Sequence, residues 1–193
     1  MEEILALDKQ WFLAINNGLA CPFLDWLCPI LREQATWYLP YALIVYYFYK
    51  HYGINTWKII LVVSLMIFIS DQFSANLIKK TFMRIRPCNE PGLQGMVRHL
   101  ISSCNGYSFV SAHAANHFAL ALLLIYYFKH ISLWVIPVAI LWACIISFSQ
   151  IYVGVHYPLD VICGGLIGGL FGISFAKYSL KYIKPALINN IKE

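Results

Sequence analysis

A series of long apolar segments, separated by short polar stretches, constrains the fold of this chain more than any other feature. Their lengths approach the ~20 residues with which a helix crosses a bilayer. The segments are Trp37–Lys50, Trp57–Ile78, Phe118–Phe128 with a start near Ser111, Ile131–Phe148 and Pro158–Ala176. Only 12% of the residues are charged, against about 25% in a soluble domain. A soluble or disordered chain is therefore excluded, and no basic run resembles a nucleic-acid-binding patch.

The N-terminal segment Trp11–Leu31 is also apolar, but prolines, a glycine and polar residues interrupt it. Intact bilayer helices avoid such a density of breakers. We therefore predict short interfacial helices within residues 1–33, anchored by Trp11 and Trp26. The chain is then an all-α, polytopic integral membrane helix bundle of one domain, with five transmembrane helices. Six spans, with one through this segment, is the alternative. The acidic start of the chain does not resemble a cleavable signal peptide.

Positive charge predicts how the bundle lies in the membrane. Lysines follow the last span and occupy two alternate short loops, which places these parts in the cytoplasm: Lys50, Lys58, Lys129, Lys177, Lys181, Lys184 and Lys192. The N-terminus and the loops 79–107 and 151–157 then lie on the extracytoplasmic face of the inner or plasma membrane, with the C-terminus in the cytoplasm. Cations in the loop 79–107 break this bias, and an anionic ligand would explain them.

Three polar stretches meet at the predicted outer face. Hydropathy alone defines the spans, so this shared position is an independent result. They cover residues 79–87, 107–114 and 149–160. Lysine and arginine hold phosphate, and a neutral imidazole oriented by a carboxylate can act as a nucleophile. His156 and Asp160 are four residues apart, which brings side chains together on a helix that Pro158 would begin. With His113 as general acid, these residues suffice for phosphate-ester cleavage without a metal.

These stretches resemble the three motifs of the type 2 phosphatidic acid phosphatase superfamily, which also includes vanadium haloperoxidases. The family pattern is K-x6-RP, then PSGH, then SR-x5-H-x3-D, and order and spacing agree over residues 37–176. The matching residues are Lys79, Arg86, Pro87, Ser111, His113, Ser149, His156 and Asp160.

The resemblance implies a role for each matching polar residue. His156 would attack phosphorus to form a phosphohistidine, Asp160 would orient it, and His113 would protonate the leaving oxygen. Water would then hydrolyse the intermediate. The phosphoryl oxygens would be held by Lys79, Arg86, Ser111, the backbone N–H of Ala112 and Gln150.

Three residues depart from the family pattern. Val110 and Ala112 replace the proline and glycine of the second motif, and Gln150 replaces the arginine of the third. Glutamine donates hydrogen bonds without charge, and loss of a charge-assisted bond costs ~1.5–3 kcal/mol, which would slow turnover ~10–100-fold. Arg84 or Lys80 is a candidate to replace the charge. Ala112 keeps its backbone donor as long as its φ need not be positive.

Two further features near the predicted outer face support the site. Asp71 lies inside the second span, where an ionisable residue usually has a functional role. We predict that Asp71 and Arg84 surround the reacting residues without contacting the substrate. Cys88 and Cys104 bracket the outer loop, where an oxidising compartment permits a disulfide worth ~3 kcal/mol. Spacing alone leaves this pairing open.

Two other patterns have structural interpretations. Gly164, Gly168 and Gly172 form a ridge of small residues on the last span, which lets helix backbones approach closely in lipid. We expect packing inside the bundle, and a homo-oligomer through these glycines is the alternative. His113 and His117 have metal-ligand spacing but no clear third ligand, so no metal or other cofactor is expected.

These patterns predict a membrane lipid phosphatase that hydrolyses a phosphomonoester or diphosphate at the outer leaflet. The loop 79–107 carries the first motif, and residues 108–176 carry the other two with the last three spans. Undecaprenyl diphosphate is the preferred substrate, with phosphatidylglycerol phosphate, phosphatidic acid and lipid A phosphate as alternatives. No obligatory protein partner is evident. Gln150 leaves a different class open, a non-catalytic phospholipid-binding or transport protein.

Overall fold

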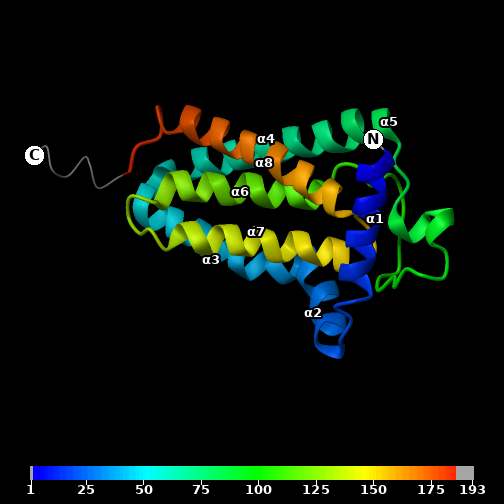
Figure 1. The fold of residues 1–193 in the computed structure, drawn as a ribbon. Helices are drawn as coiled ribbons and strands as arrows, with labels where there is room; N and C mark the ends of the chain where they lie inside the picture. The colour runs from blue at the N-terminus through cyan, green and yellow to red at the C-terminus, as the bar shows by residue number, and fades with distance from the viewer. Residues whose placement is uncertain (1, 186–193) are drawn as a thin grey trace, which may run out of the picture.

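The computed structural model describes residues 2–185, which fold into helices joined by loops. Five long helices run side by side along the molecule (Figure 1). They are α3 (Tyr38–Tyr52), α4 (Thr56–Gln72), α6 (Ala112–Phe128), α7 (Val135–Tyr152) and α8 (Pro158–Ser179). Each covers most of one predicted apolar segment, which confirms the all-α class. The last predicted cytoplasmic lysine, Lys192, lies outside the described residues.

Two shorter helices precede the bundle, α1 (Glu2–Asn16) and α2 (Pro22–Arg32). α1 lies across one end of the bundle (Figure 1). Its buried residues Asp8, Phe12 and Asn16 share one face at a spacing of four, whereas Trp11 is 61% exposed. Phe12 and the polar side chains of Asp8 and Asn16 thus face the protein, and Trp11 faces outward, where the sequence predicts an aromatic anchor at the membrane interface.

The helix that begins as α4 continues past Gln72 without a break. It runs through the π-helix η3 (Phe73–Ile78) into α5 (Lys79–Phe82) and ends at Met83, whose φ of 44° is left-handed. The turn Lys79–Phe82, predicted as the start of the outer loop, is therefore helical, and the loop begins at Met83. The remaining short helices are η1 (Gln34–Trp37), η2 (Gly53–Asn55), η4 (Pro87–Asn89) and η5 (Pro91–Leu93).

The glycine ridge of α8 packs against α6. A Cβ at Gly168 would overlap the carbonyl group of Ala115, and Gly164 and Gly172 meet the backbone of α6 in the same way. Small residues permit this close approach in a membrane protein. The ridge is used inside the chain, so the alternative of a homo-oligomer through these glycines is wrong.

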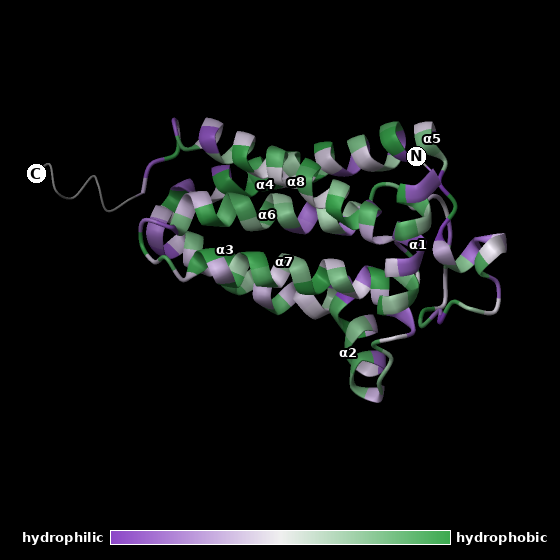
Figure 2. Ribbon diagram, viewed as in Figure 1, coloured by the Kyte–Doolittle hydropathy of each residue, from purple (hydrophilic) through white to green (hydrophobic). Residues whose placement is uncertain are grey.

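Hydrophobic residues predominate along the length of the bundle, and hydrophilic residues gather toward its ends (Figure 2). Three helical runs in the described part of the chain are long and apolar enough to cross a membrane: Gln34–Leu93, which contains α3 and α4, Val135–Tyr152 and Pro158–Ser179. The chain is an integral membrane protein. With 15 and 11 residues, α1 and α2 are shorter than a span of ~20 residues, and the number of spans stays a prediction.

Candidate active site

The structure brings the three polar stretches together at the end of the bundle that carries α1 and α2. The Ser108 N–H donates to the Arg84 carbonyl at 2.8 Å, which joins the first stretch to the second. The Ser111 N–H donates to the Asp160 carbonyl at 3.0 Å, which joins the second to the third. Backbone hydrogen bonds therefore fix the relative positions of the motifs.

His156 and Asp160 form the buried centre of this region. Their side chains are 3% and 0% exposed, with Nδ1 of His156 3.5 Å from Oδ2 of Asp160. At this separation no hydrogen bond forms, and Nδ1 has no other partner among the described residues. Pro158 begins α8 as predicted, but His156 precedes the helix. The Tyr157 N–H donates to Oδ2 of Asp160 at 2.8 Å, which turns the chain so that Nδ1 faces the carboxylate and Nε2 is left for reaction.

Burial sets the protonation state of His156. Desolvation lowers the pKa of His156 to about 4, although the Asp160 carboxylate opposes this shift. The charges of Arg86 and Lys79 act in the same direction as burial. At neutral pH the imidazole is therefore uncharged, which is the form a nucleophile needs.

Arg84 connects Asp160 to Asp8, a residue that sequence analysis missed. One guanidinium nitrogen of Arg84 donates to Asp160 at 2.7 Å, and the other donates to Asp8 at 2.6 Å. Asp8 also accepts the Leu159 N–H at 2.9 Å. Burial raises the pKa of Asp8, and Arg84 opposes this shift. The only sequence signal was the spacing of Asp8 with Phe12 on one face of the first helix.

The second motif begins α6. Ser111 is the N-cap residue, and its hydroxyl accepts the Ala114 N–H at 3.4 Å. Ala112 does not have a positive φ, so alanine fits where the family has glycine. The N–H groups of Ala112 and His113 belong to the first helical turn, which has no intrahelical acceptors. Such a helix start attracts anions.

Lys79 and Arg86 contribute positive charge, whereas Gln150 does not. Lys79 and Arg86 are partly buried, and Nε of Arg86 is buried without a hydrogen-bond partner. Gln150 is fully buried, and neither polar atom of its side chain has a partner in the described structure. Because Arg84 is held by two carboxylates, it is not free to replace the missing charge.

A cavity of about 420 Å³ extends from this end into the bundle. Ala112, His113 and Asp71 line it, together with apolar side chains of α3 and α4. Arg32, at the end of α2, lines it as well and was missed by sequence analysis. The cavity therefore has one guanidinium, one carboxylate and imidazole groups beside a long apolar wall.

His117 packs beside His113 rather than sharing a ligand with it. The two rings stack with an interplanar angle of 8°. Nδ1 of His117 lies 2.7 Å from the His113 carbonyl oxygen, and Nε2 lies 3.3 Å from the Tyr41 hydroxyl. Both ring nitrogens of His117 thus have protein partners.

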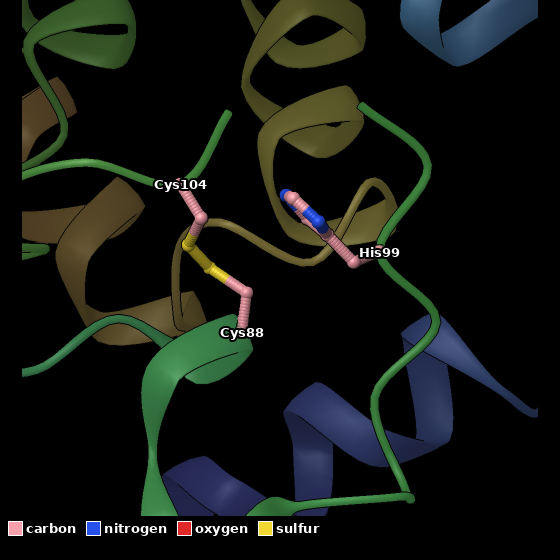
Figure 3. Close-up of side chains that lie close together, drawn as sticks. All are labelled: Cys88, His99 and Cys104. Carbon is pink, nitrogen blue, oxygen red and sulfur yellow. A yellow bond between two sulfur atoms is a disulfide. The ribbon is translucent and has the colours of Figure 1, made fainter. Parts of the chain in front are cut away.

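A disulfide joins Cys88 and Cys104, whose Cα atoms are 6.5 Å apart, and the His99 ring lies beside it (Figure 3). The bridge connects η4, which directly follows Arg86, to the loop before the second motif. Both cysteines would become potential metal ligands beside His99 only after reduction. In the oxidised chain the bridge is a covalent link between the first and second motifs.

Comparison with known proteins identifies the family of this site. The sequence profile of the PAP2 superfamily, the type 2 phosphatidic acid phosphatases, matches residues 55–184. A lipid A 4'-phosphatase of Bacteroides thetaiotaomicron is 30% identical over 181 residues, 91% of this chain and 78% of that protein. A lipid A 4'-phosphatase of Porphyromonas gingivalis is 31% identical over 177 residues, 89% of this chain and 72% of that protein. An undecaprenyl-diphosphatase of Sulfolobus acidocaldarius is 42% identical over 52 residues, 27% of this chain and 24% of that protein.

Two crystal structures share the fold. LpxE of Aquifex aeolicus has a TM-score of 0.65 and 28% identity, over 89% of this chain and 96% of that chain. The first transmembrane PAP2-type phosphatidylglycerolphosphate phosphatase from Bacillus subtilis has a TM-score of 0.69 and 19% identity, over 94% of this chain and 89% of that chain. The chain belongs to the PAP2 superfamily, as its motifs indicated, and is a lipid phosphatase of this metal-independent class.

Proposed function

We propose that this protein removes a phosphate group from a lipid A-type phosphoglycolipid at the outer leaflet of the membrane. The observation that carries the substrate class is a similarity to lipid A 4'-phosphatases along 91% of the chain. The matches to an undecaprenyl-diphosphatase and a putative undecaprenyl-diphosphatase cover 27% and 48% of the chain. Lipid A phosphate, an alternative at the sequence level, is thus better supported than undecaprenyl diphosphate, which becomes the second candidate.

The proposed reaction has two displacements at phosphorus. Nε2 of His156 attacks, the bond from phosphorus to the lipid oxygen breaks, and His113 gives that oxygen a proton. The Asp160 carboxylate, facing Nδ1 at 3.5 Å, stabilises the charge that develops on the ring. Water then attacks the phosphohistidine, and His113 takes a proton from that water. The phosphorus–nitrogen bond breaks, its electron pair returns to Nε2 of His156, and inorganic phosphate leaves.

Positioning and charge neutralisation provide most of the rate in such a phosphoryl transfer. Lys79 and Arg86 supply positive charge, and the start of α6 supplies backbone N–H groups. Ser111 holds this helix start in place through its hydrogen bond to Ala114. The arrangement supports phosphate binding without any step that requires a metal.

The cavity supports a lipid substrate. It begins at His113 and continues between apolar residues such as Ile44, Val63 and Leu120. The apolar wall keeps a lipid tail out of contact with water there, as the bilayer does. The phosphate would then lie at the polar end and the tail inside the bundle.

Phosphate release from a lipid panel tests the proposal. The purified protein is assayed in detergent with EDTA on lipid A, undecaprenyl diphosphate, phosphatidylglycerol phosphate and phosphatidic acid. We expect the highest kcat/KM on lipid A, with mass spectrometry locating the phosphate removed. His156→Ala should abolish release, because no other described residue takes the place of its nitrogen.

Two outcomes would contradict the proposal. A higher kcat/KM on undecaprenyl diphosphate than on lipid A would reassign the substrate. No release from any lipid by folded protein would instead favour a phospholipid-binding or transport protein. Binding of the same lipids to His156→Ala would then measure that function directly.

A further inference from the structure

The phosphate site of this chain lacks one positive charge that the family motifs provide. Gln150 stands at the arginine position of the third motif, and its buried amide makes no hydrogen bond. Arg84 is bound to Asp8 and Asp160. Lys80 is exposed on α5 and does not line the cavity beside His113. The charge therefore has to come from elsewhere, or be absent.

Arg32 is a cation at this site that belongs to none of the three motifs. It is the last residue of α2 and lines the same cavity as Ala112 and His113. Its Nε is buried and has no hydrogen-bond partner among residues 2–185. No ion pair of the described residues includes Arg32, and the neighbouring Glu33 is exposed.

Arg32 also lies close to a second cation, Arg86. Burial lowers the pKa of Arg86, and the charge of Arg32 adds to this shift; Arg86 has a buried Nε of its own without a partner among the described residues. Asp71 lines the cavity as well but pairs with neither arginine in the described structure. Two arginines without a shared carboxylate repel each other, and a bound anion would relieve that repulsion.

We propose that Arg32 binds a phosphoryl oxygen of the substrate and supplies the positive charge that Gln150 lacks. The inference rests on the proposed function, since the anion is the phosphate group of a lipid phosphate ester. It assigns α2 a part in the reaction beyond anchoring the chain at the membrane surface. A guanidinium from a helix outside the motifs would thus complete the phosphate site.

Charge removal and charge relocation together test this role. Arg32→Gln should lower kcat/KM ~10–100-fold and weaken inhibition by orthovanadate, a phosphate analogue, by a similar factor. Arg32→Lys should retain part of both. Gln150→Arg, added to Arg32→Gln, should recover vanadate affinity and activity, because it returns the charge to the family position. Lys9→Gln is the matched control, a cation at the same end whose charge is paired with Glu90 at 2.8 Å.

Each outcome decides for or against Arg32. If Arg32→Gln keeps both kcat/KM and vanadate affinity within about twofold of the unchanged protein, the proposal is wrong. A loss of activity with unchanged vanadate affinity would also overturn it, because Arg32 would then contact another part of the lipid. Should Arg32→Gln not fold, Arg32→Met, which keeps the apolar stem, serves instead.

A binding measurement separates this inference from the proposed function. Vanadium-51 NMR follows orthovanadate binding in the absence of any lipid. If the unchanged protein hydrolyses none of the lipids, the proposed function fails, yet weaker vanadate binding by Arg32→Gln would still support Arg32 as an anion ligand. Equal vanadate binding by the two proteins would refute it.

Discussion

His156 is enclosed by protein, and this enclosure decides which form of the imidazole is present. Burial lowers the pKa of His156 to about 4, below the ordinary value of about 6.5. The sign follows directly, since a lowered pKa means that the uncharged ring persists to lower pH. The uncharged ring that the proposed attack on phosphorus needs is therefore present at neutral pH.

We expect the His156 imidazole to titrate well below pH 6.5. Histidine carbon-13 NMR of the protein in detergent measures the midpoint, and the resonance missing from His156→Ala assigns the signal. Asp160→Asn should lower the midpoint further, because the carboxylate favours the charged ring. A midpoint at or above 6.5 would contradict the buried position of His156.

We expect Asp8 to act through Arg84 and Asp160, as a positioning residue. It holds one side of the Arg84 guanidinium while Asp160 holds the other. Asparagine at this position would still accept the Leu159 N–H but would remove the charge that faces Arg84. Asp160 would then bear the whole attraction of Arg84, and its geometry toward His156 would change.

We predict that Asp8→Asn lowers kcat about tenfold, which corresponds to ~1.4 kcal/mol, and leaves KM nearly unchanged. Asp8→Glu should recover part of kcat, and Glu3→Gln, an exposed change on the same helix, should have no effect. Steady-state kinetics on the preferred lipid measures all three. A rise in KM at constant kcat would place Asp8 in substrate binding instead.

The disulfide is the covalent connection between the first and second motifs. Cys88 and Cys104 are 16 residues apart in sequence, and closing such a loop is worth about 3 kcal/mol. We predict that Cys88→Ser or Cys104→Ser lowers the Tm in detergent by about 5–10 °C and reduces activity, because the first motif loosens from the second.

Cys144 provides the control for this prediction. It is exposed and free, so Cys144→Ser should leave the Tm unchanged. Reductant should lower the Tm of the unchanged protein to that of the serine variants and should not affect those variants. The bridge would be excluded by two results together. Thiol titration of the protein without reductant would find Cys88 and Cys104 free, and neither serine substitution would change the Tm.

The sequence predicted the long helices because a helix that crosses a membrane must be both apolar and about 20 residues long. A long apolar run in the sequence therefore marks such a helix. It missed the helical turn Lys79–Phe82, since lysines after an apolar run resemble a loop while η3 continues the backbone hydrogen bonds toward them. The motif residues followed from the resemblance of three polar stretches to the family pattern. Asp8 and Arg32 did not, because each reaches the site through the packing of a helix that is distant in sequence.

The N-terminal helices and the outer loop form one assembly over the end of the bundle. Asn16 donates to the carbonyl groups of Arg98 and Tyr152 at 2.8 and 2.7 Å. Arg98 in turn donates to Asp25 at 2.6 Å. These bonds join α1, α2, the outer loop and the end of α7, so the residues that α1 and α2 bring to the site are held in place.

The two ends of the bundle differ in a way that predicts its orientation. The motifs and the outer loop lie at one end, and the residues that follow α8 lie at the other (Figure 1). Lysines Lys177, Lys181 and Lys184 follow or end α8. Positive charge of this kind favours the cytoplasmic side, so the active site should face outward.

Cysteine accessibility tests this orientation in cells. The background carries alanine at the four free cysteines, Cys21, Cys28, Cys144 and Cys163. We expect a membrane-impermeant maleimide to label Gln94→Cys, in the exposed outer loop, in intact cells. Tyr182→Cys, at a position that is 68% exposed, should be labelled only after permeabilisation. The reverse pattern would place the active site at the cytoplasmic leaflet, which would change the lipids it meets while leaving the chemistry of His156 the same.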